Sequence, residues 1–235
     1  MFIFLNNADL SYLQFVYNAT ESPSEEVYDY IVVGGGTAGT AGCPLATTLS
    51  ANYSVLLLER GGVAFNDPNV LREENSIANL LQADDIDSPA QAFTSEDGIL
   101  NARGRVLGGG SMINFGFYSR ADEDFYNESG IEWNMNIVKN AYKWVEEAIV
   151  TKTDQINSWQ MSVKRALLQS GIRPDNGLTL DHLQGTKISG STFDRTGRRH
   201  GAVELLNKAD KNNLRVVVHA TVERVIFASN TSLGT

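Results

Sequence analysis

The chain has 235 residues, of which 28 are acidic and 19 are basic, so its formal charge is −9. This balance argues against nucleic acid and against a polybasic membrane contact as partners, because both require a basic face. Hydrophobic residues make up 42% and charged residues 20%, a composition typical of a folded globular chain. The single cysteine, Cys43, excludes an internal disulfide and a cysteine-based metal site, and we expect no metal.

The N-terminal part of the chain predicts an extension followed by a βαβ unit. Residues 1–26 contain polar turn formers around Pro23 and form the expected extension. Residues 28–33 are β-branched or aromatic and predict a buried strand that ends at three glycines. A helix over 43–49 and a second buried strand over 53–58 follow. This order predicts an α/β fold with a parallel sheet.

The remaining chain mixes irregular segments with regular ones. Residues 63–103 are polar and predict loops with short helices. Apolar residues at helical spacing predict helices over 136–150 and 158–171. Another helix is expected from residue 202 to 206, with 208 as the alternative end, and the valine-rich stretches 214–220 and 221–227 predict strands.

A glycine motif joins the first predicted strand to the first predicted helix. It reads Gly34-x-Gly36-x-x-Gly39, which permits a tight turn, a close approach to a pyrophosphate and close packing of helix on strand. Glu59 follows Gly39 by twenty residues, at the end of the next strand, where a carboxylate can accept a hydrogen bond from a ribose hydroxyl. Together these features indicate a dinucleotide site, and the alternative is a glycine loop without a ligand.

A tandem repeat interrupts this motif. Residues 37–39, Thr-Ala-Gly, are followed by the same three residues at 40–42, so either Gly39 or Gly42 can be the packing glycine. Three extra residues amount to nearly one helical turn. They must lengthen the phosphate loop or shift the start of the helix. We therefore expect the repeat to weaken dinucleotide binding.

A second glycine-rich stretch makes the pattern specific. Residues 104–114 read Gly-Arg-Val-Leu-Gly-Gly-Gly-Ser-Met-Ile-Asn, followed by Tyr118 and Ala121. With residues 29–39, this stretch resembles the signatures of the glucose–methanol–choline (GMC) oxidoreductases. Segments 181–186, 190–194, 199–200 and 214–222 are similar to the plant branch of that family, and most of all to its hydroxynitrile lyases.

The resemblance implies FAD as the dinucleotide, bound in a Rossmann-like fold. The glycines would hold the pyrophosphate, and Glu59 would hold the adenosine ribose. Asn114 would lie beside the isoalloxazine ring, and the backbone of Val222 would face the adenine. The full set of expected cofactor-binding residues is Gly34, Gly36, Thr37, Gly39, Gly42, Glu59, Arg60, Gly108, Gly109, Ser111, Asn114 and Val222.

The resemblance also implies a division of the chain. After the extension at 1–26, residues 27–125 would form the first part of the FAD-binding region. Residues 126–190 would form part of a substrate region, and 191–235 would return to the FAD-binding region. The sheet and both regions are expected to be incomplete, as in the N-terminal portion of a longer protein.

The activity implied for the whole protein is cleavage of a cyanohydrin to an aldehyde and hydrogen cyanide. Two alternatives are an FAD-dependent oxidoreductase acting on alcohols and a truncated product without catalysis. Family members carry the catalytic histidine near the C-terminus, and His182, His200 and His219 do not match it. We therefore assign no catalytic residue and expect this chain alone to be inactive.

Four Asn-x-Ser/Thr sequons indicate a secreted glycoprotein, because chance would supply only a couple. They begin at Asn18, Asn52, Asn127 and Asn230. The resemblance likewise implies the secretory pathway, with an extracellular or vacuolar destination. Residues 1–5 are apolar but lack a basic flank, so they make a poor signal peptide, and an upstream portion is expected. For the full-length family member the expected partner is a small-molecule substrate, a cyanohydrin or an alcohol, and the protein is expected to be a monomer.

Overall fold

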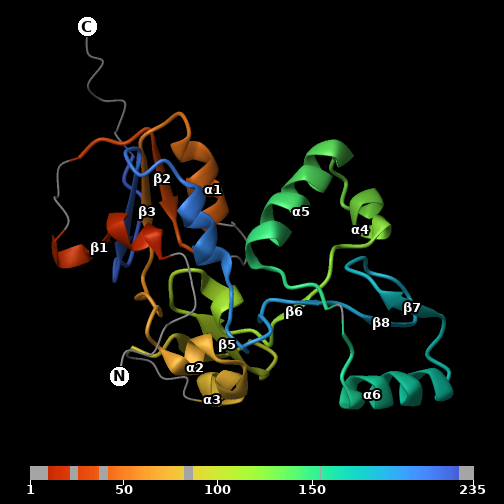
Figure 1. The fold of residues 1–235 in the computed structure, drawn as a ribbon. Coiled ribbons are helices and arrows are strands. Elements are labelled where there is room, and N and C mark those ends of the chain that lie inside the picture. The colour runs from red at the N-terminus through yellow and green to blue at the C-terminus, as the bar shows by residue number, and fades with distance from the viewer. Residues whose placement is uncertain (1–9, 22–25, 37–41, 82–86, 154, 228–235) are drawn as a thin grey trace, which may run out of the picture.

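The computed structural model describes residues 10–21, 26–36, 42–81, 87–153 and 155–227. A parallel sheet lies at one side of the molecule, and a second region built mainly from residues 117–191 extends away from it (Figure 1). None of the helices in these ranges combines the length and the apolar character needed to cross a bilayer.

The sheet has four strands in the order β1-β10-β3-β2, and each neighbouring pair is parallel. Its strands are β1 (Val16–Asn18), β10 (Leu214–Val218), β3 (Val55–Leu58) and β2 (Tyr30–Val33). Helix α1 (Gly42–Ser50) connects β2 to β3, as the glycine motif predicts. The predicted α/β class with a parallel sheet is therefore confirmed.

The main core lies between this sheet, α1 and the 3-10 helix η5 (Ala202–Lys208). The side chains of Cys43, Ala46, Val55 and Leu57 are fully buried there. Residues 202–208 were predicted as a helix, and their 3-10 winding brings Leu205 and Leu206 into the same core. This packing holds the start of α1 firmly against the ends of the strands.

The segment predicted as an N-terminal extension differs from that expectation. Residues 11–15 form the 3-10 helix η1, in which Tyr12 and Phe15 are buried. The next three residues form β1, whose Val16 pairs with Val216 of β10. A strand of three residues is too short to show an alternating pattern, so it could not be predicted from the sequence. The boundaries of the other proposed regions stay predictions.

Two predicted strands also differ in detail. Strand β2 was expected to be buried, but it is an edge strand in which Tyr30, Ile31 and Val33 are exposed and Val32 is buried. Residues 221–227 form no strand, although their valine-rich sequence favours one. Both differences arise because strand propensity reports neither the position in a sheet nor the presence of a pairing partner.

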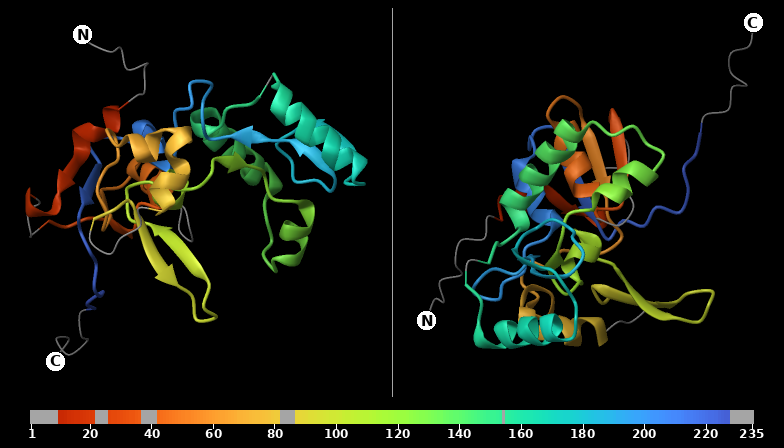
Figure 2. Two further views of the ribbon diagram at one scale, coloured as in Figure 1. Left: turned by 90° about the horizontal axis from the view of Figure 1, so that it is seen from below. Right: turned by 90° about the vertical axis from the view of Figure 1, so that its right-hand side faces the viewer.

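The irregular stretch 63–103 contains more order than the sequence predicted. Its last part forms an antiparallel hairpin, β4 (Ala90–Thr94) and β5 (Leu100–Gly104), which projects from the body of the molecule (Figure 2). The other elements of the structure are η2 (Ala19–Glu21), α2 (Pro68–Leu71), η3 (Glu73–Asn75), α3 (Ser76–Leu81), η4 (Gly109–Met112), β6 (Phe117–Tyr118), α4 (Glu123–Glu128), α5 (Met135–Ile149), α6 (Ser158–Gln169), β7 (Asp175–Leu178), β8 (Thr186–Ile188) and β9 (Gly190–Ser191).

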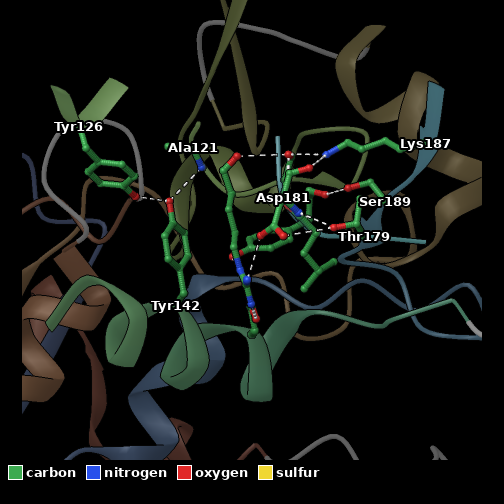
Figure 3. Close-up of polar contacts among 12 residues, drawn as sticks. Ala121, Tyr126, Tyr142, Thr179, Asp181, Lys187 and Ser189 are labelled. Carbon is green, nitrogen blue, oxygen red and sulfur yellow. Dashed lines mark hydrogen bonds and ion pairs between the residues drawn. The ribbon is translucent and has the colours of Figure 1, made fainter. Parts of the chain in front are cut away.

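Within the second region, a polar network joins α5 to β6 and to the segments around Arg120 and Asp181 (Figure 3). The buried Glu146 accepts two hydrogen bonds from Arg120, at 2.6 and 2.8 Å, and a third from the Tyr118 hydroxyl at 3.0 Å. Arg120 also pairs with Asp181 at 3.0 Å. The Tyr142 hydroxyl accepts from the Ala121 N–H at 3.0 Å. Bidentate pairing of this kind fixes orientation, so α5 and β6 are held in one arrangement.

Candidate functional site

The predicted glycine loop and the predicted acid meet at the C-terminal edge of the sheet. Because β2 and β3 are parallel and in register, Val33 lies opposite Leu58, and the next residues of both strands leave the sheet together. The Gly35 N–H donates to Glu59 Oε2 and the Gly61 N–H to Glu59 Oε1, each at 2.8 Å. Glu59 is buried and therefore fixes both turns. Each carboxylate oxygen keeps a further lone pair that can accept a ligand hydroxyl.

Gly42 has the geometry of a packing glycine. A Cβ on Gly42 would lie 1.8 Å from the Gly34 carbonyl oxygen, and the Gly42 N–H donates to the Gly36 oxygen at 2.8 Å. Helix α1 therefore begins at the second copy of the Thr-Ala-Gly repeat. Thr37 and Gly39 lie outside the described residues. Of the two candidate packing glycines, the structure therefore describes Gly42 alone.

The second glycine-rich stretch packs directly on the first. The Gly108 N–H donates to the Gly35 oxygen at 3.1 Å, and Gly108 has φ +94°, a conformation that favours glycine. The Ser111 hydroxyl donates to the Gly108 oxygen at 2.7 Å and accepts from the Ala202 N–H at 2.9 Å. The Cys43 thiol donates to the Gly35 oxygen at 2.9 Å, and burial raises its pKa, so Cys43 supports the loop and is not poised as a nucleophile.

A cavity of about 750 Å³ opens where the two loops meet, which is a normal size for a cofactor site. It is lined by Val33, Gly34, Gly36, Leu58, Glu59, Arg60, Leu80, Phe93, Ala102, Arg103, Gly104, Gly109, Gly110, Ile113, Asn114, Ala220, Thr221 and Val222. Seven predicted site residues are among them: Gly34, Gly36, Glu59, Arg60, Gly109, Asn114 and Val222. Gly42, Gly108 and Ser111 support the two loops behind this lining.

The hairpin supplies cavity residues that the sequence analysis missed. Gln91 Oε1 accepts from Arg60 at 2.6 Å and from Arg103 at 3.0 Å, and the Arg103 guanidinium lies 5.6 Å from the centre of the Phe93 ring. Burial, and then the neighbouring Arg103 charge, lower the pKa of Arg60. Two guanidinium groups on one neutral acceptor leave this side of the cavity positive. The Asp97-Gly98 pair between two short apolar runs was a usable hairpin signal.

None of the three histidines lines the cavity, all three lying within the described residues. His200 contacts Glu204 at 2.8 Å and Asp194 at 3.4 Å, and the hydrogen bond with Glu204 is the main reason that its pKa is raised. His219 occupies the turn after β10 with φ +57° and is exposed, as is His182. The site therefore has binding groups and no histidine positioned to act on a ligand in the cavity.

Residues 28–234 match the family pattern described as GMC oxidoreductase. The chain belongs to the GMC oxidoreductase family. The match covers the sheet strands β2, β3 and β10 and both glycine-rich stretches, which are the parts that form the cavity. The sequence resemblance to this family is confirmed.

Curated relatives include both an oxidase and lyases. The chain is 63% identical over 230 residues to sinalpyl alcohol oxidase Nec3 from Nesocodon mauritianus, covering 97% of this chain and 41% of that protein. It is 57% identical over 224 residues to (R)-mandelonitrile lyase 3 from Prunus serotina, covering 95% of this chain and 38% of that protein. The chain thus spans about 40% of the length of these relatives.

Solved structures show the same fold. The chain aligns with a pyridoxine 4-oxidase from Mesorbium loti at a TM-score of 0.66 and 22% identity, covering 86% of this chain and 44% of that one. It aligns with formate oxidase from Aspergillus oryzae RIB40, in a structure concerned with FAD modification, at a TM-score of 0.65 and 19% identity. This alignment covers 86% of this chain and 40% of the formate oxidase chain. The predicted Rossmann-like α/β architecture is the fold of these proteins.

Proposed function

We propose that this chain binds FAD in the cavity between its two glycine-rich loops. The observation that carries the proposal is the convergence of Gly34, Gly36, Gly109, Glu59 and Val222 on one cavity. A Cβ on Gly36 would lie 3.4 Å from Gly109 Cα, so the two loops leave a narrow cradle that a larger residue would fill. Glycine loops at the carboxyl ends of parallel strands bind pyrophosphate in this way.

The cavity lining is complementary to a dinucleotide in both charge and shape. Arg60 and Arg103 place positive charge beside the loops, where a diphosphate carries negative charge. Glu59 lies at the end of β3, where a ribose hydroxyl can donate to a carboxylate. Leu80, Phe93 and Ile113 add apolar surface against which flat rings can pack. The residues present fit the cofactor, which supplies redox chemistry when a family member uses it.

The repeat at 37–42 is proposed to weaken this binding. The Gly42 N–H, at the start of α1, is occupied by the Gly36 oxygen, and N–H groups at a helix start are the ones that normally hold phosphate. We therefore expect reversible binding with FAD lost during gel filtration. A titration of the purified chain followed by flavin fluorescence tests this, with ADP as competitor. No saturable signal from folded protein would contradict the proposal.

For the whole protein we propose the lyase reaction, in which a base takes the cyanohydrin proton, the carbon–carbon bond breaks and cyanide leaves. Its support is that several (R)-mandelonitrile lyases, at 52–57% identity, are among the relatives. Alcohol oxidation is the second candidate, supported by the 63% identity to an alcohol oxidase. Anaerobic addition of an alcohol to the whole flavoprotein would bleach the flavin absorbance only if it oxidises the substrate. Cyanide release without bleaching identifies a lyase.

The chain alone is proposed to have neither activity, because no histidine of the described residues lines the cavity. Cyanide release from the purified 235-residue chain would contradict this. The proposed location is the secretory pathway. Asn52 and Asn127 are exposed in the structure and Asn18 is half-buried, while Asn230 lies outside the described residues. A mass shift after glycosidase treatment of protein made in plant cells tests occupancy.

A further inference from the structure

Arg199 is a fully buried cation without an anionic partner in the part of the chain that the structure describes. Its Nε donates to the Val70 oxygen at 2.8 Å, its Nη2 to the Ser76 hydroxyl at 3.3 Å, and its Nη1 to the Ser111 oxygen at 3.3 Å. Its guanidinium lies 4.3 Å from the centre of the Phe193 ring. Burial lowers its pKa to about 10, so Arg199 stays charged at neutral pH.

The fourth hydrogen bond of this guanidinium reaches a cavity residue. Arg199 Nη1 donates to Asn114 Oδ1 at 2.9 Å, and the Gly116 N–H donates to the same oxygen at 2.9 Å. Two donors on one atom identify that atom as the amide oxygen, since the amide nitrogen can only donate. Asn114 Nδ2 has no hydrogen-bond partner among the described residues, and Asn114 lines the cavity. Because Oδ1 is taken by these two donors, Nδ2 is the end of this amide left to meet a ligand in the cavity.

We propose that Arg199 is a positioning residue that holds Asn114 so that its Nδ2 donates to the ring portion of the bound dinucleotide. The complementary ligand group is an acceptor, either a ring carbonyl oxygen or an unprotonated ring nitrogen. This inference rests on the proposed FAD site. There, Glu59 and the glycine loops serve the ribose and diphosphate, and Asn114 follows the second loop beyond them.

The fork geometry of arginine is what this role requires. Arg199 reaches four acceptors on α2, α3 and the 111–114 segment at once. A lysine keeps the charge but lacks the planar fork, so it cannot hold all of them together with Asn114. Arg199→Lys should therefore release the Asn114 side chain while leaving the glycine loops in place. The effect should appear with a ligand that has the ring and not with one that lacks it.

The test compares FAD with ADP, which shares the adenosine and diphosphate but has no flavin. Fluorescence titration of the full chain should show that Arg199→Lys weakens FAD binding about tenfold and changes ADP binding by less than about twofold. Arg120→Lys is the matched control, because Arg120 also bridges several acceptors but lies outside the cavity lining. It should change neither affinity. Equal loss of FAD and ADP binding in Arg199→Lys would overturn the inference.

Asn114→Asp keeps the test decisive if Arg199→Lys does not fold. An aspartate can accept the same hydrogen bonds from Arg199 and Gly116. It also places a negative charge beside the buried guanidinium, so thermal stability should rise. It removes the Nδ2 donor, so FAD binding should fall about tenfold while ADP binding changes much less. Wild-type affinity for FAD in Asn114→Asp would overturn the inference. Failure of the wild-type chain to bind FAD would instead contradict the proposed function.

Discussion

The start of α1 should not tolerate any side chain at position 42. In Gly42→Ala the new Cβ would lie 1.8 Å from the Gly34 oxygen and 2.9 Å from the Gly34 carbonyl carbon. The obstructing atoms are backbone, and Gly34 is held by its N–H bond to the Leu58 oxygen at 2.7 Å. Neither the helix nor the strand can move without losing contacts in the core.

The magnitude follows from two opposing effects. Overpacking of a core typically costs about 3 kcal/mol when backbone must shift. Alanine regains about 1 kcal/mol over glycine in a helix. The expected net loss is about 2 kcal/mol, which for a chain of this size lowers the melting temperature by about 4–8 °C. Circular dichroism melting of the ligand-free chain measures it.

Gly36→Ala is the matched control for this prediction. Its Cβ would lie 3.4 Å from Gly109 Cα, an ordinary contact, and Gly36 does not have positive φ, so stability should stay nearly unchanged. The same methyl group narrows the cradle, so FAD binding should weaken. Equal melting temperatures for Gly42→Ala and the wild type would refute the packing role of Gly42. A large stability loss in Gly36→Ala would refute the distinction between the two glycines.

Three further predictions concern the repeat and two titrating groups. Deleting residues 40–42 removes one copy of the repeat and should tighten FAD binding, and an unchanged affinity in titration would count against the repeat being harmful. Arg120 lowers the pKa of Glu146, so this pair stabilises the fold above the unfolded pKa and loses its effect as pH falls through the folded one. Glu146→Gln should therefore lower the free energy of unfolding by about 2 kcal/mol at neutral pH and by much less in acid. Thermal melting at several pH values measures this difference, and a loss of stability that does not change with pH would contradict it. The hydrogen bond with Glu204 raises the pKa of His200. This pair therefore stabilises the fold fully below the pKa that His200 has in the unfolded chain, and the stabilisation is lost as pH rises through the pKa of His200 in the folded chain. His200→Gln should remove that alkaline loss from the melting profile, and a profile like that of the wild type would contradict this.

The sequence predicted the part of the cavity lining that depends on local backbone rules. Gly34, Gly36 and Glu59 could be placed because a tight turn and an adjacent parallel strand leave few other arrangements. The repeat left the packing glycine open between two positions, and only the close approach of Gly42 to Gly34 supports the second.

Long-range contacts account for what the sequence did not predict. Arg199 lies far along the chain from Ser111 and Asn114, and the residues next to it in the sequence do not indicate that it is buried against them. Strand β1 pairs with β10, whose paired residues lie 200 positions later in the chain. Such features come from tertiary packing that overrides or supplies local preference.

One titration decides whether the cavity between the two glycine loops binds FAD. The purified wild-type chain, shown to be folded by circular dichroism, is titrated with FAD and then with ADP as competitor. We expect saturable one-to-one binding of FAD that ADP displaces and that Gly36→Ala weakens. Absence of saturable binding to the folded chain, or binding that Gly36→Ala leaves unchanged, would contradict it.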